Sequence, residues 1–335
     1  FFRKCFYLCV VMLYNSIENQ LIQAVMIDFS QFKSILSLTT YFNTNEKCKQ
    51  AIAESRWADG DVICPYCGKH HCKTRTDGRY RCPNCRLNFS VTVGTIFENS
   101  PLPLIKWFVA MFLISCHKKG ISSLQLATDI EVTQKTAWYM LMKIRSLYVQ
   151  ETAELEGEVE LDEAYIGGKE QWKHESKKTE GTQGRSTKTK TPIFGLVERK
   201  GDVIVKVVED TKGKTLSPII RRFVKKGSRI FTDEYVGYHT LDKSEYKHEV
   251  VFHNEKKFVD GDAHTNTMEG FWGHFKRMIC GTYHFCSSAR LQMYVNEQVF
   301  RWNSREWDES ERFTNMFKHC IGTFTYQDVL ELVAA

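Results

Sequence analysis

The sequence lacks an apolar run long enough to cross a lipid bilayer. The run that most resembles one, Cys5 to Tyr14, has ten residues, whereas a membrane-spanning helix needs about 20. Arg3 and Lys4 precede this run as in a signal peptide, but no small-residue cleavage site follows it. The first residue is not Met, and the first well-patterned segment follows Met26. We therefore expect no membrane partner, and we expect residues 1–25 to be upstream translation or a fragment that folding and activity do not need.

Basic residues are missing from one stretch of the chain, and acidic residues are scarce in another. Residues 151–163 contain seven acids and no base, and residues 69–86 contain six bases and one acid. The whole chain of 335 residues has a net charge of only +6. Such asymmetry suits a protein that holds a polyanion with one part and metal cations with another. Solvated faces of opposite sign are the alternative, which composition alone leaves open.

The pattern of a disulfide scaffold is also missing, although the chain has twelve cysteines. Four of them form two Cys-x-x-Cys pairs, Cys64 with Cys67 and Cys82 with Cys85, and the others are scattered. In a chain of this length the pattern favours a reducing compartment and a bound metal. A Thr-Asp-Gly turn lets the chain between the pairs return as a hairpin. Four thiolates are the ligands of a closed structural Zn²⁺ site, so we predict a zinc ribbon over 61–95.

The side chains around this ribbon are predicted to serve DNA binding. Phosphate contacts are expected from four arginines, Arg75, Arg79, Arg81 and Arg86. His70, His71 and Cys72 lie beside a complete set of cysteine ligands, so we expect them to be surface residues.

Residues 100–150 are predicted to form a helix-turn-helix region, which begins with a buried helix at 101–116. The second helix of the pair is capped by Thr133, after a turn at Glu131 and Val132. Its inward positions recur every three or four residues, at Ala137, Leu141, Ile144 and Tyr148, and its outward positions are Gln134, Lys135, Thr136, Tyr139 and Lys143. We expect the outward Gln134, Lys135, Thr136 and Lys143 to contact DNA. An ordinary helical hairpin is the alternative.

The apolar period changes at Glu158, where Val159 and Leu161 alternate with Glu160 and Asp162. This alternation predicts a strand with acids on one face. A basic stretch without apolar residues, 169–192, is predicted to be a mobile loop. Further strands are predicted at 193–198, 203–208, 229–233 and 248–252, and helices at 216–224, 291–302 and 308–317. Together these elements predict an α/β domain.

Another helix is predicted to begin near Thr265 or Asn266. Lys276 follows Glu269 by seven residues, which is close to two helical turns, so a carboxylate and an ammonium share one side. Three aromatic residues, Phe271, Trp272 and Phe275, are predicted to pack the helix against a core. A structural ion pair and a catalytic site would both explain this pattern.

Three acids have placements that suit a metal site. Asp162 lies on the first strand, Asp233 at the end of a later strand, and Glu269 on the helix after the sheet. Mg²⁺ usually takes one or two carboxylates, with water and phosphate as its other ligands. Carboxylates that converge at one sheet edge therefore suit two Mg²⁺ or Mn²⁺ ions that act on phosphodiesters. Lys276 would hold a phosphate as a point charge.

In combination, these motifs resemble the zinc-ribbon DDE transposases of bacterial insertion sequences. The resemblance rests on the two Cys pairs, V-T-V-G-T-I-F, K-K-G-I-S-S-L-Q-L-A, E-L-D-E-A-Y-I-G-G-K around Asp162, T-D-E-Y-x-G-Y around Asp233, and H-T-N-T-M-E-G-F-W before Lys276, then G-T-Y-H. It extends from about Met26 to Trp302 and implies an RNase H-like catalytic domain over 156–303, with a mixed sheet and flanking helices. A helical lead-in at 26–60 and a C-terminal helical tail at 304–335 complete the expected organisation.

The resemblance also implies roles for single residues. Asp162 and Asp233 match the first two acids of the family, and Lys276 matches the basic residue that follows the third. Because family members have either Asn or Glu as the third, Asn266 and Glu269 are both candidates. His264 and His284 match recurrent positions, for which we expect packing rather than catalysis.

The function implied is that of a transposase that binds the terminal inverted repeats of its element, then cleaves and joins DNA. Zn²⁺ would be structural, and Mg²⁺ or Mn²⁺ catalytic. The expected partners are double-stranded DNA, both element ends and target, and a second copy of the chain, since two ends must be held at once. We expect a cytoplasmic, nucleoid-associated protein. A DNA-binding regulator derived from a transposase, or a metal-dependent nuclease or resolvase that cleaves without joining, are the alternatives.

Overall fold

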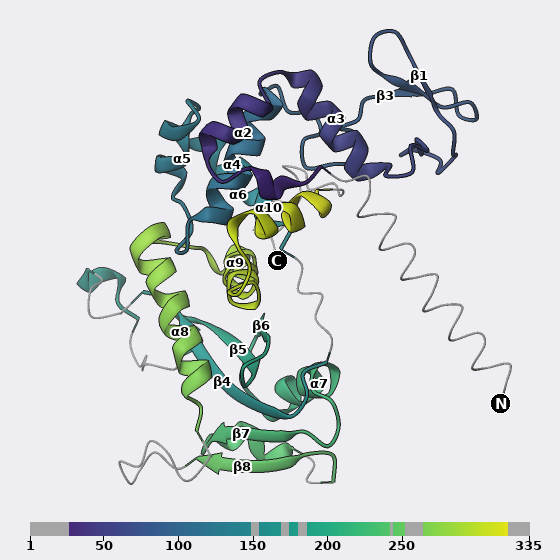
Figure 1. The fold of residues 1–335 in the computed structure, drawn as a ribbon. Coiled ribbons are helices and arrows are strands. Elements are labelled where there is room, and N and C mark those ends of the chain that lie inside the picture. The colour runs from purple at the N-terminus through teal and green to yellow at the C-terminus, as the bar shows by residue number, and fades with distance from the viewer. Residues whose placement is uncertain are drawn as a thin grey trace, which may run out of the picture. The chain divides into compact units, whose positions relative to one another are not determined.

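The computed structural model describes residues 27–148, 154–168, 174–179, 186–241, 244–251 and 264–320. They divide into two compact units (Figure 1). One contains the described residues up to His117, Ser123–Leu147 and those from Trp307 onward, and the other contains Lys118–Ser122 and the described residues between Tyr148 and Glu306. Within the described ranges no helix is long and apolar enough to cross a membrane. The proposed upstream segment, 1–25, lies outside these ranges.

The first unit is built on aromatic residues contributed by both ends of its sequence. Its helical elements include η1 (Phe29–Gln31), α2 (Ile35–Tyr41), α3 (Asn45–Arg56), α4 (Leu104–Cys116) and α10 (Glu309–Lys318). The ring of Phe29 lies 4.9 Å from that of Phe313 and 4.9 Å from that of Phe317, and Phe317 lies 5.2 Å from Phe108. Helix α10, with an Asp308 capping box, therefore packs into the same core as the lead-in helices and α4.

A small antiparallel sheet follows α3. It consists of β1 (Lys73–Thr74), β2 (Tyr80–Arg81) and β3 (Asn88–Phe89). The predicted hairpin is confirmed: the amide of Arg75 donates to the carbonyl of Arg79, and Gly78 has φ +72° in the turn. Tyr80 stacks on Phe89 at 5.6 Å, which gives this short sheet its apolar face.

Two helices of the first unit, α5 (Ser123–Asp129) and α6 (Gln134–Arg145), occupy the positions predicted for the helix-turn-helix pair. Thr133 caps α6, since its hydroxyl accepts the amide of Thr136 at 3.2 Å. Glu131 has φ +51° in the turn, and the amide of Val132 donates to the carbonyl of Ala127. The predicted inward residues of α6 are buried, namely Ala137, Leu141 and Ile144.

The second unit contains a five-stranded sheet in the order β6-β5-β4-β7-β8. The strands are β4 (Glu158–Ile166), β5 (Thr191–Glu198), β6 (Val203–Val207), β7 (Arg229–Asp233) and β8 (Lys247–Val251). Strands β4, β5 and β6 are antiparallel neighbours, whereas β7 runs parallel to β4 and β8 runs parallel to β7. This mixed sheet with flanking helices is the RNase H-like fold expected from the sequence.

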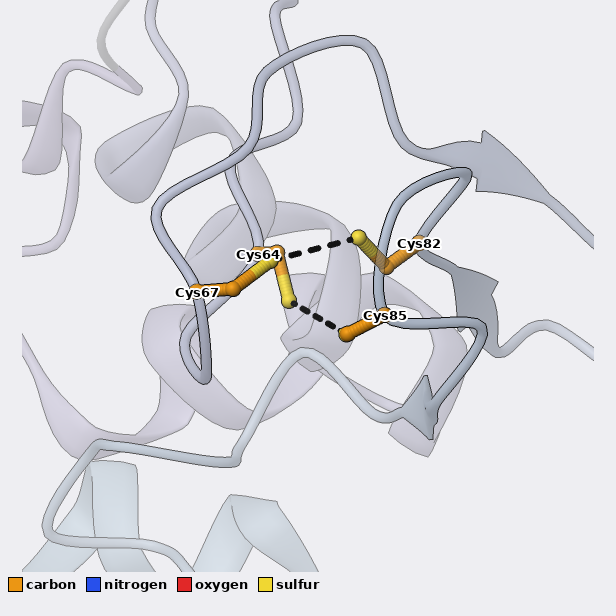
Figure 2. A group of neighbouring side chains, drawn as sticks. All are labelled: Cys64, Cys67, Cys82 and Cys85. Atoms are coloured by element: carbon orange, nitrogen blue, oxygen red, sulfur yellow. Dashed lines mark hydrogen bonds between the residues drawn. The ribbon is translucent and has the colours of Figure 1, made fainter.

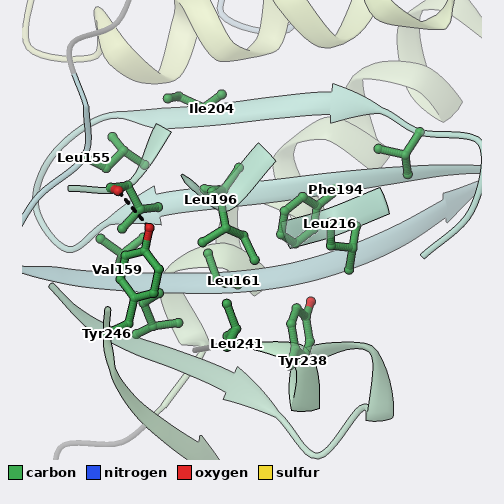
Figure 3. Close-up of a cluster of buried hydrophobic side chains, with 14 residues drawn as sticks. Leu155, Val159, Leu161, Phe194, Leu196, Ile204, Leu216, Tyr238, Leu241 and Tyr246 are labelled. Carbon is green, nitrogen blue, oxygen red and sulfur yellow. Dashed lines mark hydrogen bonds between the residues drawn. The ribbon is translucent and has the colours of Figure 1, made fainter. Parts of the chain in front are cut away.

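One face of the sheet packs on α7 (Gly213–Phe223) through a cluster that includes Val159, Leu161 and Leu216 (Figure 3). Glu160 and Asp162 alternate with these apolar positions and therefore point to the opposite face. Helix α8 (Asn266–Met278) covers β4 and β5, and α9 (Leu291–Asn303) packs on β6. The alternating pattern of β4 thus directs its acids toward α8.

The start of helix α7 differs from the prediction. Helix α7 begins at Gly213 and includes Pro218, where the sequence indicated a start near Ser217. Asp210 fixes the earlier start by accepting the Lys212 amide and the Thr215 hydroxyl. Pro218 is exposed, so water can replace the backbone hydrogen bond that its ring removes.

The predicted basic loop, 169–192, is also shorter than expected. Strand β5 begins at Thr191, and a short helix, η3, spans Glu175–Lys177. The antiparallel ladder extends this far because Thr191 pairs with Ile166 at the end of β4. Residues 169–173 and 180–185 lie outside the described ranges.

Candidate zinc site and active site

The four cysteines of the ribbon gather into one cluster (Figure 2). Their sulfur atoms all lie within 4.8 Å of one another, with 3.7 Å between Cys64 and Cys85 and 3.5 Å between Cys67 and Cys82. A tetrahedron of thiolates about 2.3 Å from Zn²⁺ has sulfur–sulfur edges of about 3.8 Å. Two knuckles on adjacent turns therefore provide a donor set that fits a structural Zn²⁺ ion.

The neighbours of this cluster differ in exposure. His70 and His71 are exposed as predicted, and both contact the carboxylate of Asp61, at 2.6 and 2.8 Å. Cys72 was expected at the surface, but it is buried. Its amide donates to the carbonyl of Val62, and this bond draws it against the chain that leads into the first knuckle.

The predicted DNA-contacting side chains fall into two groups. Most are available to a ligand: Arg75, Arg79, Arg81, Arg86, Gln134 and Lys135 are exposed, and Thr136 is partly exposed. Lys143 was predicted to face outward and does not. It is buried, and its Nζ donates to the carbonyl of Ile96 at 3.0 Å and lies 6.0 Å from the ring centre of Trp107. Lys143 therefore holds the loop before α4 inside the first unit.

A cavity of about 530 Å³ lies next to α6 in the first unit. Lys135, Trp138, Tyr139 and Trp107 are among the residues that line it. None of the candidate catalytic acids contributes to its wall, so this cavity is not part of the acidic site.

Asp162 lies in the middle of β4, on the face covered by α8. One carboxylate oxygen accepts the amide of Glu163 at 2.8 Å, and the other accepts the indole N–H of Trp272 at 2.9 Å. Burial, followed by the negative charges of Glu163 and Asp233, raises the pKa of Asp162 to about 7. The side chain is thus held in an environment that favours its protonated form unless a cation is present.

Asp233 is brought beside Asp162 by the parallel pairing of β4 and β7. The ladder pairs Glu158 with Arg229 and ends at Glu160 with Phe231. The same offset, continued for two positions beyond the last pair, leads to Asp162 and Asp233. Residues at matching positions of adjacent parallel strands share a face, and the negative charge of Asp233 contributes to the raised pKa of Asp162. Asp233 also accepts the amide of Tyr235 at 3.1 Å, which orients it at the strand end.

Trp272 was predicted only as a packing residue, but it also binds Asp162. The approach of its helix depends on Gly195, which pairs with Asp162 across the ladder to β5. A Cβ atom at Gly195 would lie 2.8 Å from Cζ2 of Trp272 and closer still to Met268. Only a residue without a side chain lets α8 lie so near the strand. The sequence pattern identifies the aromatic face of the helix, but not the partner of its indole N–H.

Glu160, two residues before Asp162, was predicted as part of an acidic face without a role of its own. Its side chain is fully buried and accepts the amides of Thr267 and Met268 at 2.9 and 3.0 Å. These are N-terminal amides of α8, which lack partners within the helix. Thr265 is the N-cap by position but makes no side-chain cap bond, so Glu160 replaces the usual cap.

The two candidates for the third acidic position differ in their placement on α8. Glu269 precedes Trp272 by three residues, about 60° around the helix, whereas Asn266 precedes it by six, about 120° around. Lys276 lies on the same side as Glu269, and all three are exposed. No ion pair joins Glu269 to Lys276 in the described part of the chain, so the structural ion pair considered from the sequence does not form.

The donor set for Mg²⁺ is partly assembled. The donor atoms of the four ribbon cysteines all lie within 4.8 Å of one another. Among the described residues, the donor atoms of Asp162, Asp233 and Glu269 do not come this close together. Mg²⁺ commonly takes one or two carboxylates and completes its shell with water and phosphate. Asp162 and Asp233, whose charges interact, offer carboxylates of this number, and Glu269 lies on the adjoining flank of α8.

Comparisons with known proteins agree with this organisation. Residues 154–303 match the model of the ISXO2-like transposase domain, and residues 43–88 match that of the transposase zinc-ribbon domain. An uncharacterized protein in transposable element ISH50 of Halobacterium salinarum is 28% identical over 282 residues, which cover 79% of this chain and 95% of that protein. An uncharacterized transposase-like protein of Haemophilus influenzae is 32% identical over 107 residues, 32% of this chain and 85% of that protein.

Proposed function

Because the chain belongs to the transposases of insertion sequences that combine a zinc ribbon with an ISXO2-like DDE domain, we propose that it binds the ends of its element and catalyses metal-dependent cleavage and joining of DNA strands. The observation that supports the proposal is that Asp162 and Asp233 lie on the adjacent parallel strands β4 and β7, close enough for the charge of Asp233 to raise the pKa of Asp162. Two carboxylates whose charges interact, one of them partly buried, favour the binding of cations between them.

Asp162 and Asp233 are the residues that would hold Mg²⁺ or Mn²⁺. When bound, such ions supply activation of a water or a 3′ hydroxyl and stabilisation of the leaving oxygen. Trp272 orients one oxygen of Asp162, and the amide of Tyr235 orients Asp233. These bonds hold both carboxylates in place without any contribution from DNA.

Glu269 is the better candidate for the third position. It lies on the flank of α8 nearest Trp272, whose indole touches Asp162, whereas Asn266 lies twice as far around the helix. Lys276 shares the flank of Glu269, and its exposed ammonium suits a contact to a DNA phosphate near the acids.

The helical unit and the ribbon would hold the element ends. The ribbon contributes Arg75, Arg79, Arg81 and Arg86 for phosphates, and α6 contributes Gln134, Lys135 and Thr136 at the N-terminal turn that enters a groove in helix-turn-helix proteins. Since two ends must be held together, the active species would be a homodimer or a larger synaptic assembly at the nucleoid in the cytoplasm.

A strand-joining assay tests this function. Purified protein is incubated with a labelled terminal repeat and a target duplex, with Mg²⁺, Mn²⁺ or EDTA. Joined products that require a divalent ion are expected. Cleavage without joining would instead identify a nuclease or resolvase, and binding without cleavage would identify a regulator.

A further inference from the structure

We propose that Glu160 is a positioning residue that ties the first turn of α8 to the central strand and thereby sets where Glu269 stands relative to Asp162 and Asp233. The inference rests on the proposed function, because it concerns the geometry of the same metal site.

The contacts of Glu160 converge on the start of α8. Oε2 accepts the amides of Thr267 and Met268, and Oε1 accepts the hydroxyl of Thr267 at 3.0 Å. Nδ1 of His264 lies 3.1 Å from Oε1. The two amides belong to the residues immediately before Glu269. A shift of Glu160 would therefore move the backbone that carries the Glu269 side chain.

Arg199, in the connection between β5 and β6, binds both Glu160 and the residue that leads into α8. Its Nε donates to Oε1 of Glu160 at 2.9 Å, and its Nη2 donates to the carbonyl of His264 at 2.9 Å. The guanidinium also lies 4.0 Å from the ring centre of Phe231 on β7. A carboxylate buried without donors would destabilise the fold. This one has a cation and a helix N-terminus as partners, which compensate its burial.

Two links between β4 and α8 bracket Glu269. Glu160 holds the first turn of the helix through two backbone amides, and Asp162 holds the helix through Trp272, about one turn later. On the strand the two acids are two residues apart, which is about 6.7 Å. Loss of the first link would leave α8 free to pivot about Trp272, and Glu269 would move with the loosened turn.

The test compares Glu160→Gln with Glu158→Gln. Both variants remove one negative charge from β4 and from the surroundings of Arg199, but Glu158 binds Arg199 and Arg229 and no amide of α8. In Glu160→Gln, we expect the amides of Thr267 and Met268 to exchange with deuterium at least about tenfold faster than in the wild type. Calorimetry should show the dissociation constant for Mn²⁺ rising by about 10–100-fold. In Glu158→Gln both quantities should stay within about 1.5-fold of the wild type, because Glu158 makes no bond to α8.

Thr267→Val keeps the test decisive if Glu160→Gln does not fold. It removes only the hydroxyl bonded to Oε1, and we expect faster exchange and weaker Mn²⁺ binding by about threefold. Unchanged exchange and Mn²⁺ binding in whichever variant folds, or equal effects in Glu158→Gln, would overturn the role of Glu160. If the wild type itself binds no Mn²⁺, the proposed function fails, and the assigned role in metal binding fails with it.

Discussion

At the scale of single residues, the acidic site combines burial with like charge. Asp162 lies against α8 and next to Glu163 and Asp233, and these surroundings raise its pKa to about 7. The usual pKa of an aspartate in an unfolded chain is about 3.9. The folded metal-free protein therefore binds a proton at Asp162 that the unfolded chain has already released, over the range between about pH 4 and pH 7.

This difference predicts how the metal-free protein responds to pH. Asp162 contributes most to the free energy of unfolding below about pH 4. This contribution falls as pH rises from about 4 to about 7, and above that range it is lower than below pH 4 by up to roughly 4 kcal/mol. Asp162→Asn removes the ionisation. With EDTA present, we expect the variant to melt higher than the wild type at pH 8 and close to it at pH 4.5. Equal melting temperatures at pH 8 would contradict the raised pKa.

The sequence places Asp162 and Asp233 correctly on strands, because alternation and strand ends are local properties. It does not reveal the partners of Asp162 and Glu160, since Trp272 and the first amides of α8 are more than 100 residues away along the chain. Lys143 was mispredicted for a related reason. Periodicity gives its angle on α6, but only tertiary packing shows that the loop before α4 covers that side.

At the scale of elements, the decisive contact is the packing of α8 on β4 and β5. The sequence predicted the start of α8 and its buried aromatic face, and the structure confirms both. The sequence does not show why β5 needs glycine at position 195. The reason lies in α8, where Met268 and Trp272 pack over that residue.

The glycines of β5 and α8 give a matched pair of variants. Gly195→Val should push α8 away from the strand, break the bond between Trp272 and Asp162, and lower stability by about 1–3 kcal/mol. Gly270→Ala should instead be neutral or raise stability by about 0.5–1 kcal/mol. Gly270 is helical and exposed, and a Cβ atom there would meet no other atom within 4 Å. Urea unfolding measures both changes, and a Gly195→Val variant as stable as the wild type would contradict the close packing.

At the scale of the whole molecule, the chain consists of two units with separate chemistry. The unit with the ribbon carries the cysteine cluster and the exposed arginines, and the other carries Asp162 and Asp233. In the proposed function, the unit with the ribbon would hold the element ends and the other unit would cut them. The charge asymmetry of the sequence, basic at 69–86 and acidic at 151–163, corresponds to this division.

Removal of zinc should therefore affect binding more than the catalytic fold. Cys82→Ser leaves three thiolates, and we expect loss of bound zinc and at least about a hundredfold weaker binding to the terminal repeat. Cys280→Ser, at an exposed cysteine outside the cluster, is the control and should bind zinc and DNA normally. Zinc content and gel-shift titration measure the two effects. Unimpaired end binding by a zinc-free Cys82→Ser protein would contradict the assigned role of the ribbon.

In the proposed function, Asp162 and Asp233 together hold the catalytic metal ions. The most direct measurement is cleavage of a labelled element end by the wild type, Asp162→Asn and Asp233→Asn over a titration of Mn²⁺, with end binding measured on the same preparations. We predict that both variants bind the end as the wild type does and cleave it below detection at every Mn²⁺ concentration. Wild-type cleavage by either variant, or cleavage by the wild type in EDTA, would contradict the claim.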